Sequence, residues 1–141
     1  MGKINIGRLL LGGIVAGIVG DILGYLVDGV LLAQNWSDEM LALNRNEFST
    51  NQLIEFNLLG LVFGILSIWI YVSMRSRFGA GWKTAICAGV TAWAIGTLLP
   101  NASFMWAGGL FSKHLTFYTT LGGLVEVVAG TVAGAALYKE G

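Results

Sequence analysis

The stretch from Leu9 to Ala33 constrains the fold most, because it is long, apolar and free of positive charge. It holds 25 residues, and a helix needs about 20 apolar residues to cross the hydrocarbon core of a bilayer. Two carboxylates, Asp21 and Asp28, interrupt the apolar run. The stretch therefore predicts a transmembrane helix that carries acids inside the membrane.

Glycines recur along this stretch at helical spacing. On a helix that turns about 100° per residue, one stripe contains Gly13, Gly17, Gly20, Gly24 and Asp28, and Asp21 lies beside it. Small residues mark the faces on which membrane helices approach each other closely. We therefore expect a second helix to pack on this stripe, with both acids directed at that helix rather than at lipid.

Three further apolar segments follow, and the predicted spans lie near residues 9–33, 52–74, 83–108 and 115–137. The chain is thus predicted to be a single domain, an all-α integral membrane protein built as a four-helix transmembrane bundle. Small residues also form stripes on the second and fourth spans, where we expect them to serve helix packing: Gly60, Gly64, Gly122, Gly130 and Gly134.

The composition supports a membrane protein and excludes other classes. Only 11% of the 141 residues are charged and 55% are hydrophobic, whereas soluble domains carry about 25% charged residues. The net charge is zero and no basic run is present, so we expect the lipid bilayer, and no nucleic acid, as a partner. Neither a metal-spaced His/Cys set nor a nucleophile–base pair is visible. We expect no enzyme activity, catalytic residue, metal or cofactor.

Two segments are less regular. Pro100 interrupts the third span, and the residue before a proline is disfavoured in the α region; we favour a kink there over a re-entrant stretch, with Asn101 and Ser103 satisfying the freed backbone groups. In the polar loop after the first span, residues 36–43 predict a short helix with Ser37 as its N-cap.

The positive charges predict an orientation. With four spans, one side of the membrane carries Lys3, Arg8, Arg75, Arg77, Lys83 and Lys139, whereas the other carries only Arg45 and Lys113. The positive-inside rule then places both termini in the cytoplasm, which for a bacterial protein means the inner membrane.

Asp21, Asp28 and Glu126 are the candidate functional residues. Asp21 and Glu126 lie near the middle of the first and fourth spans, and no Lys or Arg lies at that depth. A carboxylate in the membrane costs about 2.5–3.5 kcal/mol on insertion scales and is a functional hypothesis by default. The acids are either protonated because they are buried, or they face water or a bound cation. A pathway for protons or cations fits the second case, with Asp28 at its entrance.

Three interpretations remain open at this point. The acids serve only to hydrogen-bond the helices together, or they form part of a proton- or cation-coupled transporter or channel, which would be a homo-oligomer. Alternatively, the chain is an accessory subunit that docks on a larger membrane complex through its glycine-lined faces. In each case we expect the first and fourth spans to pack through their small residues and to bring Asp21 and Glu126 together.

The first span ends in LVDGVLLAQNW and the chain closes with GGLVEVVAGTVAGAALYKE. With these segments the whole chain resembles small bacterial membrane proteins with four transmembrane helices. The resemblance implies the same four-span fold and no particular activity.

Overall fold

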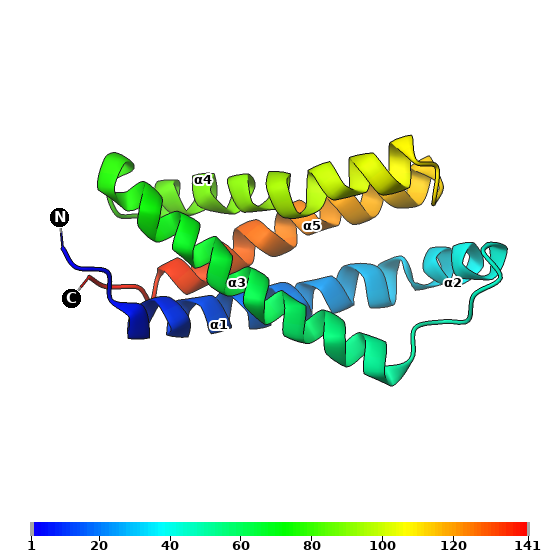
Figure 1. Ribbon diagram of the computed structural model, residues 1–141, viewed down its shortest axis with the longest axis horizontal. Helices are drawn as coiled ribbons and strands as arrows, with labels where there is room; N and C mark the ends of the chain where they lie inside the picture. The colour runs from blue at the N-terminus through cyan, green and yellow to red at the C-terminus, as the bar shows by residue number, and fades with distance from the viewer. Residues whose placement is uncertain (1, 141) are drawn as a thin grey trace.

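The structure, a computed structural model, describes residues 2–140, and over that range it is helical without strands. Four helical rods are long and apolar enough to cross a membrane: Ile6–Leu31, Thr50–Phe78, Trp82–Ala107 and Lys113–Ala135. They lie within a few residues of the predicted spans. The chain thus has the helices of a four-span membrane protein (Figure 1).

The first rod changes its helical geometry halfway. Helix α1 (Ile6–Gly24) continues directly into a π-helical segment, η1 (Tyr25–Leu31), which contains Asp28. The second rod is the single helix α3 (Thr50–Phe78), which begins with a capping box formed by Ser49 and Gln52. The fourth rod is α5 (Lys113–Ala135), capped by Ser112. Short π-helical segments are frequent at functional sites, so the position of Asp28 in η1 supports it as a candidate functional residue.

The third rod passes through Pro100 as one helix. It consists of α4 (Trp82–Trp93) and two π-helical segments, η2 (Ala94–Leu98) and η3 (Asn101–Ala107). Leu99 stays in the α region despite the following proline, with φ and ψ of −65° and −46°. The wider π turns on both sides accommodate a proline, which lacks an N–H and crowds the preceding turn. No re-entrant stretch forms.

A short helix, α2 (Ala33–Ala42), follows the first rod. It begins three residues earlier than predicted, and Ser37 is not its N-cap, since Leu32 holds that position. The Ser37 hydroxyl instead donates a hydrogen bond to Glu47 at 3.0 Å. Glu39 of α2 accepts a hydrogen bond from the backbone N–H of Ser112 at 2.8 Å. Helix α2 is therefore attached to the start of α5.

Helix α1 packs against both α3 and α5, and α4 completes the bundle against these two helices. A Cβ atom on Gly64 of α3 would collide with the backbone of Gly13 and Gly17 on α1. Similarly, a Cβ atom on Gly130 of α5 would lie 2.5 Å from the carbonyl oxygen of Ala16. The expected packing of the first and fourth spans through small residues is confirmed, and α3 uses the same kind of contact.

Helix α3 crosses α1 at an angle (Figure 1). The closest backbone contacts at this crossing involve Gly13 and Gly17 of α1 and Gly64 of α3. Toward the end of the bundle where α2 lies, α3 diverges from α1 (Figure 1). The glycine stripe of α1 therefore meets α3 only in its first half.

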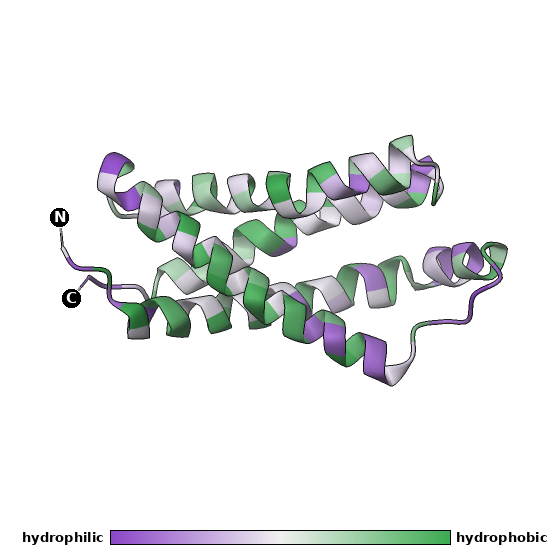
Figure 2. Cartoon of the chain, viewed as in Figure 1, coloured by the Kyte–Doolittle hydropathy of each residue, from purple (hydrophilic) through white to green (hydrophobic). Residues whose placement is uncertain are grey.

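The outward faces of the rods are apolar. On α3, Leu59 is 63% exposed and Leu66 is 54% exposed. Figure 2 shows hydrophobic residues along the rods and hydrophilic residues concentrated at the two ends of the bundle. Exposed apolar surface of this extent is that of a helix bundle in contact with lipid.

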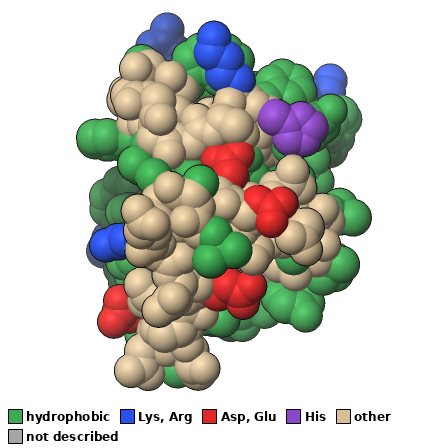
Figure 3. Space-filling model, turned by 90° about the vertical axis from the view of Figure 1, so that its right-hand side faces the viewer, with side chains coloured by type: hydrophobic (Ala, Val, Ile, Leu, Met, Phe, Trp, Pro, Cys, Tyr) green, Lys and Arg blue, Asp and Glu red, His purple; other side chains and the backbone are tan. Residues whose placement is uncertain are grey.

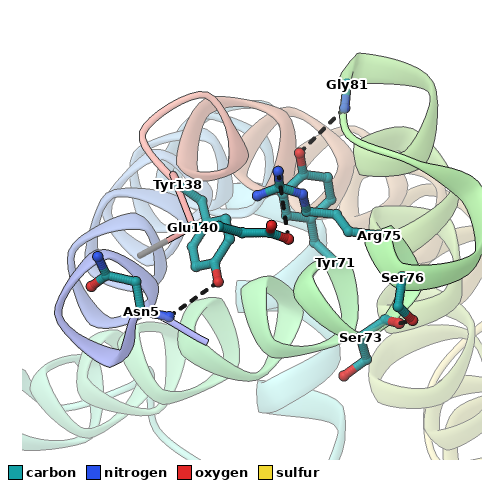
Figure 4. Close-up of polar contacts among 8 residues, drawn as sticks. All are labelled: Asn5, Tyr71, Ser73, Arg75, Ser76, Gly81, Tyr138 and Glu140. Atoms are coloured by element: carbon teal, nitrogen blue, oxygen red, sulfur yellow. Dashed lines mark hydrogen bonds and ion pairs between the residues drawn. The ribbon is translucent and has the colours of Figure 1, made fainter. Parts of the chain in front are cut away.

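A cluster around Arg75 joins the chain termini to α3 (Figure 4). The guanidinium lies 4.9 Å from the ring centroid of Tyr138 and 3.8 Å from a carboxylate oxygen of Glu140. The Tyr138 hydroxyl accepts a hydrogen bond from the backbone N–H of Asn5. Tyr71, on the other side of Arg75, accepts one from the backbone N–H of Gly81. These contacts hold the two chain termini against α3 at the end of the bundle where the termini lie.

Candidate functional site

Two cavities lie between the helices, and they share part of their walls. The central cavity, of about 580 Å³, is lined by α1, α3, α5 and the third rod, and it opens at the side past the exposed residues Leu59 and Leu66 of α3. The loop-side cavity, of about 560 Å³, lies nearer α2 and the loop that follows it. Both are lined by Gly20, Asp21, Phe56 and Glu126. The two carboxylates thus stand where one cavity meets the next.

The divergence of α3 from α1 explains why the cavities form there. The second half of the α1 glycine stripe lies beside α5 rather than α3, and its contacts are looser than those at the crossing point. A Cβ atom on Gly20 would have no neighbour closer than 3.8 Å, and one on Gly24 would lie 3.4 Å from the carboxylate of Glu126. Gly20 thus lies against the backbone of α5, whereas Gly24 leaves room for the side chain of Glu126.

Asp21 projects from α1 toward α3. A Cβ atom on Gly60 would collide with a carboxylate oxygen of Asp21, so the glycine at position 60 makes room for this side chain. Asp21 is partly buried and lines both cavities. The acid therefore lies at the contact between α1 and α3, on the wall that the two cavities share.

Glu126 comes from the opposite wall, formed by α5. Its Oε1 atom is buried and has no hydrogen-bond partner among the described residues. Buried polar atoms in proteins are nearly always hydrogen-bonded, and an unpaired carboxylate oxygen is a costly exception. Glu126 therefore presents unused hydrogen-bonding capacity at the junction of the two cavities.

Asp28 lines only the loop-side cavity, and its carboxylate is held by two other elements. Its Oδ1 accepts a hydrogen bond from the indole N–H of Trp36 at 3.0 Å and one from the hydroxyl of Thr119 at 2.7 Å. Trp36 belongs to α2 and Thr119 to α5. A carboxylate has about four acceptor positions, so Asp28 is fixed in place while it retains acceptor capacity.

The remaining wall of the loop-side cavity includes residues that sequence reasoning missed. Glu47 and Phe48 come from the loop before α3, and Asn57 comes from α3 itself. The Phe48 ring lies 6.1 Å from Trp36 and 5.3 Å from Phe56, between ring centroids. Among these three residues, only Asn57 could have been recognised from the sequence, because it is a polar amide inside a predicted apolar span.

No Lys or Arg is among the residues that line either cavity, whereas four lining residues are Asp or Glu: Asp21, Asp28, Glu47 and Glu126. Figure 3 views the end of the bundle that holds α2 and shows acidic side chains on this face, with basic ones nearer its margins. Low-dielectric walls lined by one sign of charge attract counter-ions. The arrangement is suited to cations.

The chain thus has four helices that are long and apolar enough to span a membrane, with acidic side chains in the walls of the cavities between them. Comparison of the chain with protein-family models, curated proteins and solved structures finds no match. The resemblance to small four-helix bacterial membrane proteins therefore rests on the four apolar helices alone. Any function must be argued from the site itself.

Proposed function

We propose that this protein moves cations across the bacterial inner membrane, as a channel or as a proton- or cation-coupled transporter, through the path lined by Asp21, Asp28 and Glu126. The observation that carries this proposal is that two acidic cavities meet at Asp21 and Glu126, near the middle of their rods. Intramembrane carboxylates without a basic partner are typical of ion pathways and proton relays. The loop-side cavity provides the entrance, and the close contact of α1 and α3 at Gly17 and Gly64 bounds the central cavity.

The hypothesis that the acids only hold helices together has less support. A packing role predicts that each carboxyl is engaged in hydrogen bonds between helices. Asp28 meets this expectation, but Glu126 does not, because its buried Oε1 has no partner. The Oε1 atom of Glu126, near the middle of α5, thus contributes no hydrogen bond to helix attachment.

Purified protein in lipid vesicles tests the proposal. Under an imposed gradient of protons, monovalent metal cations or organic ammonium ions, we expect a flux above that of protein-free vesicles, recorded by an internal pH dye and by tracer uptake. Equal flux with and without protein, for all three classes of cation, would contradict the proposed function.

We also propose that both termini lie in the cytoplasm. The terminal end of the bundle carries six of the eight Lys and Arg residues, as the positive-inside rule requires. Reporter fusions at each end of the chain are expected to be active in the cytoplasm. A periplasmic signal from either terminus would reject this orientation and would place the loop-side cavity on the cytoplasmic face.

The accessory-subunit alternative was motivated by glycine-lined faces. Gly13, Gly17, Gly64 and Gly130 face other helices of the same chain, so they do not offer a docking surface. The alternative and the homo-oligomer both remain predictions. A single chain supplies the lining of both cavities, and the central cavity opens at the side past the exposed residues Leu59 and Leu66 of α3.

A further inference from the structure

We propose that the loop-side cavity binds a linear aliphatic polyamine, with its ammonium groups distributed over three acidic positions. This inference rests on the proposed function and names the substrate class of the same site. The three positions are the deep pair Asp21 and Glu126, the middle acid Asp28, and Glu47 at the loop.

The spacing of the acids argues against a metal ion. Among residues 2–140, no three His, Cys, Asp or Glu side chains lie close enough together to hold one metal. Asp21 and Asp28 are seven residues apart on one rod, which corresponds to about 10 Å along a helix axis. Separated carboxylates in one cavity match separated positive charges on one molecule, and a linear polyamine carries such charges.

The walls between the acids suit the methylene segments of a polyamine. Trp36, Phe48 and Phe56 line the cavity, and their rings form a continuous series of contacts. Aromatic faces attract ammonium groups and pack against apolar chains. A volume of about 560 Å³ lies within the usual range for small-molecule sites, about 300–1,000 Å³.

Glu126 supplies an independent sign that a ligand group is expected here. Its Oε1 is buried and lacks a partner, while the carboxylate of Asp28 is oriented in advance by Trp36 and Thr119. An ammonium group at the deep position would satisfy the Glu126 oxygen with a charge-assisted hydrogen bond.

Binding to the full chain in detergent tests the proposal by calorimetry, with butylamine, 1,4-diaminobutane and spermidine as probes of one, two and three charges. We expect affinity to rise by about tenfold or more with each added ammonium group, since hydrogen bonds between charged groups have this strength. Mg²⁺ is the control, because it carries two positive charges on one small ion instead of separated charges along a chain. Equal affinity for butylamine and spermidine, or tighter binding of Mg²⁺ than of spermidine, would overturn the proposal.

Single substitutions test which acidic residue binds which ammonium group of the polyamine. Glu47→Gln is expected to lower spermidine affinity about tenfold and to remove most of its advantage over 1,4-diaminobutane, whereas Glu126→Gln lowers the affinity for both. Glu55→Gln is the matched control, because Glu55 is exposed on α3 and lines neither cavity. A loss of affinity in Glu55→Gln as large as in Glu47→Gln would contradict the assignment.

The binding assay and the vesicle assay can refute the two proposals independently of each other. Charge-dependent binding without flux of any cation, spermidine included, would contradict the proposed function and leave the binding site standing. Flux of small cations without a preference for spermidine over butylamine would contradict the substrate class and leave the transport function standing.

Discussion

Replacement of Glu126 by Gln is expected to reduce cation flux in vesicles about tenfold or more without unfolding the protein. The amide has the same shape but no charge, so it cannot attract a cation or carry a proton at the junction of the two cavities. The fold should survive, because Oε1 of Glu126 makes no hydrogen bond that the substitution would break. Asp21→Asn is expected to behave in the same way, because Asp21 lines the same junction.

The control for both variants is Glu55→Gln. This residue also lies on a membrane-spanning rod, but it is exposed and outside the cavities, so flux and melting temperature should be unchanged. A stable Glu126→Gln protein with full flux would show that the acids serve packing only. Unfolding of Asp21→Asn would mean that its carboxylate is needed for the fold.

Replacement of Gly64 by Ala is expected to destabilise the bundle by about 1–3 kcal/mol, the usual cost of overpacking a filled interior. The added methyl group would collide with the backbone of Gly13 and Gly17, and backbone atoms cannot move aside as a flexible side chain can. The helices α1 and α3 must then separate at their crossing point. Thermal unfolding in detergent, followed by circular dichroism, measures the effect.

Gly20→Ala is the matched substitution on α1. Its methyl group would have no neighbour closer than 3.8 Å, and Ala is favoured over Gly inside a helix by about 1 kcal/mol. The variant should therefore be as stable as the natural protein or slightly more stable. Equal destabilisation by Gly64→Ala and Gly20→Ala would contradict the crossing geometry, because the two positions would then be equally crowded.

The sequence predicts the four rods well, because a bilayer requires long apolar segments and Leu9–Ala33 satisfies that requirement directly. It also predicts that small residues face other helices. It does not tell which helix each glycine meets. Gly13 and Gly20 share one stripe, yet Gly13 contacts α3 while Gly20 lies beside Glu126 of α5, because α3 crosses α1 at an angle and then diverges.

The site was predictable in part. Asp21, Asp28 and Glu126 are recognisable because acids are rare inside apolar segments. The partners of Asp28 are not, since Trp36 reaches it only through the turn between η1 and α2, and Thr119 only through the packing of α5. Glu47 and Phe48 lie in a polar loop, where the sequence gives no reason to single them out, and only the position of that loop beside α2 brings them into the cavity wall.

Cysteine labelling measures whether water-soluble cations reach the junction of the two cavities, as the proposed pathway requires. In a Cys87→Ser background, which removes the only native thiol, Gly20→Cys places a thiol on the shared wall. Ile22→Cys, two residues away and 57% exposed on the outer face, places one in lipid at nearly the same depth. A positively charged, membrane-impermeant thiol reagent is added from the side that holds α2. We predict modification of Gly20→Cys and none of Ile22→Cys; an unreactive Gly20→Cys would contradict an open acidic path.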